Sequence, residues 1–234
     1  MKRLYEDVSV VAENGLYTIK LDGRPVRSPG RQLLALPTSV LAESVAAEWR
    51  AQAEKIVSES MPMTRFANSA IDRIRPRHDE VVDEIAAYAE TDLLCYRSDS
   101  PDDLADRQAF TWQPILDWGA KRYGAKLRVT QTITPVPQDK KALKAIWAEV
   151  ASHDDFALSG LHGLTTAMGS IVLAFAVSEG RIAAEEAAAA SLLDEMFQAE
   201  KWGEDSEAVA RWEAIGTEIA AAARFLSVAL PNSP

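Results

Sequence analysis

Strand-like alternation is concentrated in residues 8–36, and this placement constrains the fold more than any other feature. Apolar and polar residues alternate over residues 8–12 and again over 17–21. An Asn-Gly pair at Asn14 and an Asp-Gly pair at Asp22 follow the two runs, and such pairs favour the tight turns of β-hairpins. The segment that ends at residue 36 can return as another strand. A sheet this small is not stable alone, so we predict an antiparallel meander with a helix on one face.

The covering helix is predicted directly after the strands, over residues 38–55. Thr38 can cap its N-terminus, and an apolar stripe runs through Leu41, Val45 and Trp49. Trp49 is therefore expected to pack against the meander.

Residues 61–97 hold two further helical patterns. The first is expected to end at Pro76, because proline lacks an N–H group and disfavours a helical residue before it. The second begins near Arg77 with an acidic first turn, which the helix dipole favours. The apolar run 93–96 fits either a buried strand or a helix end.

The pattern changes after residue 97. A loop of serine, aspartate and proline leads into a helix in which Pro114 is expected to cause a kink or a break. Residues 126–134 form a possible strand. The chain beyond residue 139 has a helical pattern throughout, with helices predicted near 139–151, 156–178, 184–201 and 205–229.

These patterns predict an α+β fold. Residues 1–97 are expected to form an N-terminal α+β domain, a small antiparallel β-meander with packed helices. Residues 98–234 are expected to form an all-α helical bundle domain. The helix predicted at 156–178 is expected at the centre of the bundle, because it is apolar nearly all round and carries a stripe of small residues.

Composition limits the partners that the chain can have. Apolar residues make up 47% of the sequence, which excludes a disordered chain. The net charge of −10 argues against a nucleic-acid partner or an anionic membrane surface. No apolar stretch is long enough to cross a bilayer, so no membrane insertion is expected. The single cysteine and the lack of a signal-like start favour a cytoplasm-like compartment.

The residues that could carry chemistry form no recognisable catalytic or metal-binding pattern. His162 shares a helical face with apolar residues, which favours a core or boundary position over a functional one. Cys95 lies in an apolar run without a basic neighbour, which is typical of an inert buried thiol. The glycine- and arginine-rich segment 23–30 lacks the spacing of a phosphate loop and favours a turn. We therefore predict no catalytic residue and no metal site.

The charged segment 65–84 leaves an enzymatic alternative open. Arg65, Asp72 and Arg73 lie in it, and the sequence does not assign their roles. A small hydrolase could arrange such arginines and carboxylates around a cleft. The segment contains no nucleophile paired with a base, which argues against this alternative.

The sharpest candidate for partner binding is the helix end in residues 192–205. Apolar residues there form a stripe on which the next position is Glu200, followed by Lys201 and Trp202. Gly203 is well placed to end the helix. Aromatic and charged residues together are common in binding hot spots but also at ordinary helix corners, and spacing alone leaves both interpretations open.

Several segments, spread in order over nearly the whole chain, together resemble one protein family: the assembly chaperones of the α subunit of the F-type ATP synthase catalytic head. The segments are DGRPVRSPG at 22–30, AAEWRAQ at 46–52, MPMTRFANSAIDR at 61–73, EIAAYAETDLLCYR at 84–97, the tryptophan pair of WQPILDW at 112–118, and FQAEKWGED at 197–205.

The resemblance implies a chaperone that binds the free α subunit and shields its β-facing surface until assembly. It implies no enzymatic activity and no cofactor, and a bacterial, cytoplasmic family member. The family's important acidic position lies in the helix that ends with the tryptophan-glycine pair, where both Glu195 and Glu200 fall. The partner-binding residues expected here are therefore Glu195, Glu200, Lys201 and Trp202.

Overall fold

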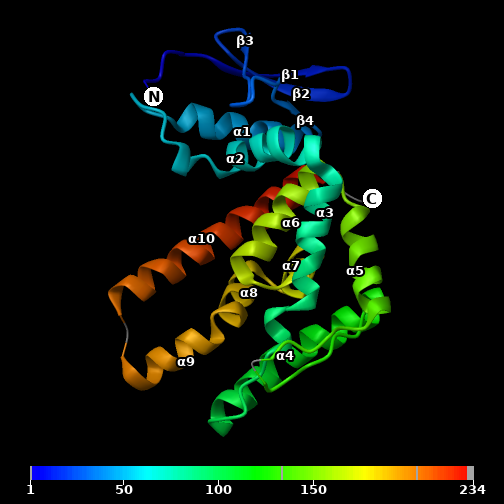
Figure 1. Cartoon of the computed structure of the whole chain (residues 1–234). Helices are drawn as coiled ribbons and strands as arrows, with labels where there is room; N and C mark the ends of the chain where they lie inside the picture. Colours follow the sequence, from blue (N-terminus) through cyan, green and yellow to red (C-terminus); the bar gives the residue numbers. More distant parts are fainter. Residues whose placement is uncertain (1, 133, 204, 231–234) are drawn as a thin grey trace. The chain divides into compact units, whose positions relative to one another are not determined.

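The structure, a computed structural model, describes residues 2–132, 134–203 and 205–230 (Figure 1). The chain divides into two compact units. Unit 1 comprises Met1–His78, His153–Gly160 and Arg224–Pro234, and unit 2 comprises Asp79–Ser152 and Leu161–Ala223. Two helices, α6 (Asp155–Met168) and α10 (Ser206–Ala229), contribute residues to both units. The sequence predicts that two independently folding domains meet between residues 97 and 98, and this boundary stays a prediction.

The sheet of unit 1 is the antiparallel meander that the alternation predicts. Strands β1 (Val8–Glu13) and β2 (Leu16–Leu21) pair along their full length, and the short β3 (Arg24–Pro25) and β4 (Ala35–Leu36) both pair with β2. The residues of both turn pairs have positive φ angles, from 47° to 78°. Such angles match the type I′ turns that Asn-Gly and Asp-Gly pairs favour.

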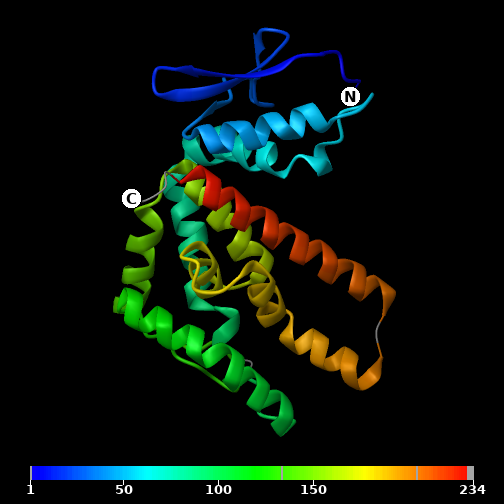
Figure 2. The ribbon, with the colours of Figure 1, turned by 180° about the vertical axis from the view of Figure 1, so that it is seen from behind.

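Helix α1 (Ser39–Ala51) covers the sheet, and α2 (Pro62–Ser69) lies beside α1 in both ribbon views (Figures 1 and 2). Thr38 caps α1 as predicted, since its hydroxyl oxygen accepts a hydrogen bond from the Leu41 N–H at 3.1 Å. The α1 side chain of Glu48 accepts hydrogen bonds from the Met63 and Thr64 N–H groups at 2.7 and 2.8 Å. One carboxylate therefore caps α2 and ties it to α1.

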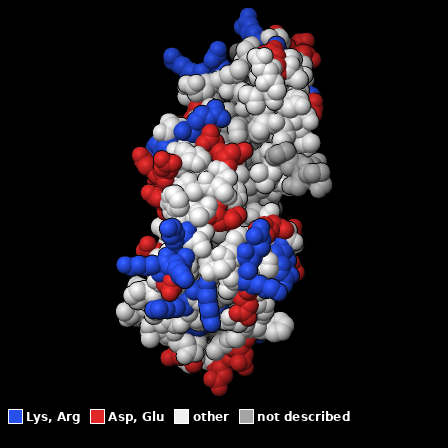
Figure 3. Space-filling model, turned by 90° about the vertical axis from the view of Figure 1, so that its right-hand side faces the viewer, with Lys and Arg blue, Asp and Glu red and all other residues white. Residues whose placement is uncertain are grey.

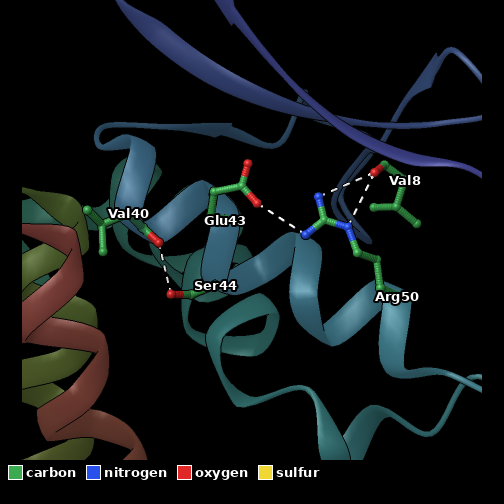
Figure 4. A network of polar contacts seen from close by, with 5 residues as sticks. All are labelled: Val8, Val40, Glu43, Ser44 and Arg50. Atoms are coloured by element: carbon green, nitrogen blue, oxygen red, sulfur yellow. Dashed lines mark hydrogen bonds and ion pairs between the residues drawn. The ribbon is translucent and has the colours of Figure 1, made fainter.

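Polar contacts also join α1 to the sheet (Figure 4). The Arg50 guanidinium donates to the Val8 carbonyl of β1 at 3.4 Å and forms an ion pair with Glu43 at 3.1 Å. Trp49 does not lie in the buried stripe of α1, contrary to the sequence-based expectation. Its ring is half-buried and meets Tyr5 edge-on, with ring centroids 5.8 Å apart. Trp49 follows Val45 by four residues, slightly more than one helical turn. Its side chain therefore lies at the margin of the buried face of α1, where a large ring can stay partly open to solvent.

Pro76 does not separate two helices by a loop. The chain continues from α2 through a π-helical turn, η2 (Ala70–Ile74), and a 3₁₀ turn, η3 (Arg75–Arg77), into α3 (His78–Ala86). Because proline has no N–H group to donate, the regular α-helical pattern is interrupted, and the change of helical period accommodates it. The second helix nevertheless begins where the sequence predicts.

The other helical elements lie in residues 58–60 and from residue 87 onward: η1 (Ser58–Ser60), η4 (Ala87–Glu90), η5 (Leu93–Cys95), α4 (Asp102–Tyr123), α5 (Lys140–Ala151), α7 (Ile171–Ser178), α8 (Ala184–Ser191) and α9 (Leu193–Trp202). The α+β class is confirmed, with the sheet at the N-terminus and helices after it. Helix α4 remains a single helix although it contains Pro114, so the expected break is absent.

The helix predicted at 156–178 is in fact two helices, α6 and α7. Gly169 has a φ of 65°, which ends α6, and Ser170 starts α7 by accepting a hydrogen bond from the Leu173 N–H at 3.0 Å. The Ser170 hydroxyl in turn donates to the buried Asp92 carboxylate at 2.8 Å. The break thus depends on a residue 78 positions earlier in the chain.

Two smaller expectations were also wrong. The segment predicted as a strand at 126–134 forms, among its described residues, a single bridge from Thr130 to Tyr96 rather than a strand. The helix predicted at 184–201 is divided at Leu192 into α8 and α9.

Candidate functional site

Helices α4 and α9 of unit 2 are joined side by side by a pair of ion pairs. The Arg107 Nη1 atom donates to both carboxylate oxygens of Glu200, at 3.0 and 2.8 Å. The Lys201 Nζ atom donates to Asp103 at 2.9 Å. All four side chains are about half exposed, and exposed pairs of this kind contribute only about 0.2–1 kcal/mol each to stability. These ion pairs therefore fix the positions of the surface side chains more than they stabilise the fold.

A buried layer lies below these ion pairs. Phe197 is only 3% exposed, and the charged groups of Arg107 and Lys201 each lie 5.2 Å from its ring centroid. Deeper in the unit, Gln108 donates to Asp194 at 2.7 Å and the Trp112 indole donates to the Ala190 carbonyl at 2.8 Å. The cation–π contacts and the Gln108–Asp194 bond join α4 to α9, and the Trp112–Ala190 bond joins α4 to α8.

Two large aromatic side chains stand exposed beside the ion pairs. Trp202 at the end of α9 is 79% exposed, and Phe110 of α4 is 85% exposed. Phe110 follows Asp103 and Arg107 at steps of seven and three residues, so the three residues share one face of α4. We call the six residues Asp103, Arg107, Phe110, Glu200, Lys201 and Trp202 the α4–α9 surface.

The surface position of Phe110 was not predicted from the sequence. A signal was present, because Phe110 lies two positions before the fully buried Trp112. Residues two apart on an α-helix point in nearly opposite directions. Only one of the two aromatic rings could therefore face the core.

Three of the four predicted partner-binding residues, Glu200, Lys201 and Trp202, lie together on the α4–α9 surface. The fourth, Glu195, accepts a hydrogen bond from the Trp212 indole of α10 at 2.7 Å and pairs with Arg211. Glu195 therefore joins α9 to α10, whereas Glu200 joins α9 to α4. Both candidate carboxylates have partners within unit 2, as the helix-corner interpretation also expects.

Positive charge gathers elsewhere on unit 2, although the whole chain has a net charge of −10. Figure 3 shows Lys and Arg side chains concentrated in the lower part of one face, over the end of α4 and the start of α5. Residues 121–144 contain a single acidic residue, Asp139, and the exposed cations Lys121, Arg122, Lys126, Arg128, Lys140, Lys141 and Lys144. The net charge therefore does not describe every face that a partner could meet.

The side chains that were considered for catalysis are buried or bonded to other residues of the fold. Burial raises the pKa of the Cys95 thiol to about 12, which keeps it protonated and unreactive. In the charged segment 65–84, Asp72 accepts hydrogen bonds from Ser28 and Gly30, while Arg75 and His78 both pair with Asp155. The residues that the structure describes include no group of three His, Cys, Asp or Glu side chains able to hold a metal ion. No helix in the described part of the chain is long and apolar enough to cross a membrane.

Exposed aromatic side chains on helices that also carry fixed ion pairs are typical of a protein-binding surface, and comparison with known proteins gives the class as a chaperone. The family model described as ATP12 chaperone protein matches residues 2–120. The chain belongs to the ATP12 chaperone family. The expectation of an ATP synthase assembly chaperone is thereby confirmed at the level of the family.

Solved structures agree with this assignment. The crystal structure of Atp12 from Paracoccus denitrificans and that of an aspartate-to-lysine mutant of the same protein are each 44% identical to this chain. Each covers 98% of both chains with a TM-score of 0.95. The Atu1473 protein of Agrobacterium tumefaciens is 38% identical, with a TM-score of 0.92 over 97% of this chain and 85% of its own. The mitochondrial atp12 protein of Schizosaccharomyces pombe is 23% identical over an alignment of 214 residues, and the match covers 86% of this chain and 74% of that protein.

Proposed function

We propose that this chain binds the free α subunit of the ATP synthase catalytic head and shields its β-facing surface until the subunits assemble. The observation that carries the proposal is the α4–α9 surface of a chaperone-family protein, with Trp202 and Phe110 exposed beside fixed charges. Aromatic side chains of this size bury much apolar area on binding, and they dominate many protein interfaces.

The physical need for such a partner is plain. A subunit made for an oligomeric ring exposes a large apolar interface before its neighbours arrive, and exposed apolar patches of that kind drive aggregation. A chaperone that covers the patch must later be displaced by the β subunit. Its binding therefore has to be reversible, and the charged rim of the α4–α9 surface suits an interface that releases.

Within this proposal Glu200, Lys201 and Trp202 contact the α subunit directly. Glu195 contributes by holding α9 against α10 through Arg211 and Trp212. We place the chain in a bacterial cytoplasm, in agreement with its bacterial relatives of high identity.

An aggregation assay tests this function. Isolated α subunit is warmed with the purified chain at near-equal molar ratio and without nucleotide, and light scattering is recorded. We expect wild-type chain to suppress scattering and a Phe110→Ala, Trp202→Ala double variant to lose most of this effect. Truncation of two hot-spot aromatic residues typically costs about 2 kcal/mol or more each, hence well over tenfold in affinity.

Trp147→Ala is the matched control. Trp147 is also an exposed tryptophan of unit 2, at 44% exposure, but it lies on α5. Equal loss in this control and in the double variant would show a general effect of surface tryptophans and would count against the α4–α9 surface. Failure of wild-type chain, under conditions where an unrelated holdase succeeds, would count against α-subunit binding itself.

A further inference from the structure

A cleft of about 750 Å³ in unit 2 lies between the end of α4, the loop that follows it and the start of α5. We call it the basic cleft. Its lining combines three cations with three apolar side chains, Lys126, Arg128 and Lys141 with Leu127, Val129 and Val136. The one carboxylate among its described lining residues belongs to Asp139, which caps α5 by accepting a hydrogen bond from the Lys141 N–H at 2.7 Å. The cleft therefore favours a negative partner.

The loop wall of the basic cleft is held in place by side-chain hydrogen bonds. The Arg128 N–H donates to the Gln138 side-chain oxygen at 2.7 Å, and the Gln138 amide donates back to the Arg128 carbonyl at 3.0 Å. The Arg128 guanidinium also donates to the Pro137 carbonyl at 3.2 Å. A wall that is already ordered loses little conformational entropy when a partner binds.

The two lysines of the cleft can receive a carboxylate. Lys126 and Lys141 are exposed, and their ammonium groups have no hydrogen-bond or ion-pair partner in the part of the chain that the structure describes. Exposed cations of this kind form charge-assisted hydrogen bonds with a carboxylate that approaches them.

Charge is strongly segregated around the basic cleft (Figure 3). Unit 2 contains twelve Lys and Arg residues and twenty-four Asp and Glu residues, and residues 121–144 hold seven of the former and one of the latter. A long polyanion such as a nucleic acid, or an anionic membrane surface, would extend from this cationic segment to the acidic remainder of the unit and be repelled there. A protein whose acidic residues are confined to one segment fits the distribution better.

The basic cleft adjoins the α4–α9 surface along helix α4. Gln113 lines the cleft, and it follows the exposed Phe110 by three positions. Residues three apart are neighbours on the surface of an α-helix, with Cβ atoms about 5–6 Å apart. A protein interface of standard size covers about 800 Å² of each partner, which is roughly 30 Å across. A partner that covers Phe110 therefore reaches the basic cleft as well.

We propose that the basic cleft binds an acidic segment of the free α subunit, beside the aromatic contact on the α4–α9 surface. This inference rests on the proposed function and adds to it a contact of different chemistry. The cations attract the acidic segment during the encounter and raise the association rate, whereas Phe110 and Trp202 slow dissociation once the complex has formed.

Association kinetics of the full chain with purified α subunit test the proposal. The variant Lys126→Glu, Lys141→Glu reverses two exposed cations of the basic cleft. We expect it to associate at least about tenfold more slowly than wild type in about 0.1 M salt, and the difference to shrink in about 1 M salt, where the Debye length is about 3 Å. The Phe110→Ala, Trp202→Ala variant is expected to change mainly the dissociation rate.

A matched control separates the cleft from the general field of the protein. Lys2→Glu, Lys55→Glu changes the net charge by the same amount at two exposed lysines of unit 1, and it is expected to alter the association rate by less than about twofold. Loss of folding is not expected in the cleft variant, because Lys141 lies in the first turn of α5, where the helix dipole favours a carboxylate. Thermal melting of each variant checks this point.

Three results would overturn the proposal. The cleft variant could associate as fast as wild type at both salt concentrations, or the unit 1 control could slow association equally. A short single-stranded RNA could displace the α subunit from wild type and lose its affinity in the cleft variant, which would indicate a nucleic-acid surface. All three are measured while wild type binds the α subunit, so they differ from failure of the proposed function, in which wild type does not bind it at all and this inference falls too.

Discussion

Asp92 is the most deeply buried carboxyl group described in unit 2, with no exposed surface. Its oxygens accept hydrogen bonds from the Leu94 N–H at 3.0 Å, the Ser170 hydroxyl at 2.8 Å and the Val172 N–H at 3.2 Å. Burial raises the pKa of Asp92 from 3.8 to about 6 although these donors act to lower it. One side chain therefore caps both η5 and α7 and pays a desolvation cost when it ionises.

The raised pKa predicts a pH dependence of stability with a definite sign. The neutral acid is favoured in the folded state, so its stabilising effect is complete below about pH 4 and is lost as the pH rises through about 6. A shift of about two pKa units corresponds to roughly 3 kcal/mol. We expect the free energy of unfolding of wild type, relative to Asp92→Asn, to fall by up to that amount between pH 4 and pH 7.

Urea unfolding of both proteins across this pH range provides the measurement. Taking the difference between wild type and variant removes the contribution of the other carboxyl groups. A difference that stays constant with pH, or grows as the pH rises, would contradict the raised pKa of Asp92.

At the scale of single elements, the loop between β3 and β4 depends on its contact with η2. Gly30 is needed there for space, because its N–H reaches the Asp72 carboxylate with no room for a Cβ atom. Its φ angle is not in the left-handed region, so close approach rather than backbone conformation explains this glycine. The sequence favoured a turn over a phosphate loop in 23–30, and the N–H group of Gly30 in this segment donates to the chain's own Asp72 carboxylate.

Identical substitutions at two glycines should have opposite effects. Gly30→Ala is expected to lower the free energy of unfolding by about 1–3 kcal/mol, because the added methyl group displaces the loop from Asp72. Gly216→Ala lies in the middle of α10 with nothing near the new methyl group, and it is expected to raise stability by about 0.5–1 kcal/mol. Chemical denaturation measures both, and a neutral Gly30→Ala would show that the loop yields easily.

At the scale of the whole molecule, the Glu200–Arg107 pair raises the question of whether Glu200 serves the fold or a partner. Glu200→Lys is expected to leave the melting temperature nearly unchanged, because the pair is half exposed. Binding of the α subunit is expected to weaken about thirtyfold or more, the equivalent of about 2 kcal/mol for a lost interfacial charge contact.

A charge swap distinguishes the two roles of Glu200. Combining Glu200→Lys with Arg107→Glu restores an ion pair between α4 and α9, but the charge at position 200 remains reversed. Continued weak binding in the double variant supports a direct contact of Glu200 with the partner. Full recovery of binding would show that Glu200 acts only through Arg107.

The domain boundary can also be tested on the whole chain. We predict that limited proteolysis cuts in the loop of residues 97–104 and yields a helical C-terminal fragment, because the composition changes there. Gel filtration and circular dichroism of the separated fragment measure its compactness and its helix content. An uncut chain, or a fragment that unfolds on separation, would instead favour a single cooperative fold.

Within unit 1, the last turns of α10 belong with the N-terminal elements. Phe225 packs on Phe66 with ring centroids 5.2 Å apart, and the Thr38 hydroxyl donates to the Val228 carbonyl. Residues 159 and 190 positions apart therefore share one core. No local pattern indicates such a contact, because it depends on where the chain returns after the intervening helices.

The sequence by itself determined the features that local chemistry fixes. The turns at Asn14 and Asp22, the Thr38 cap and the buried positions Leu41 and Val45 of α1 each depend on residues a few positions apart, and each was predicted. One residue of the candidate surface, Trp202, was also proposed from the local sequence, because it lies at a helix end just before a glycine.

Tertiary structure decided what depends on distant residues. The helix break at Gly169 and Ser170 is stabilised by Asp92, and the partner of Glu200 is Arg107, 93 positions away. The exposure of Phe110 likewise required knowing that Trp112 takes the buried side of α4. A local pattern specifies which conformations a segment prefers, whereas the burial of a side chain and its hydrogen-bond partners are set by whichever segments the folded chain brings beside it.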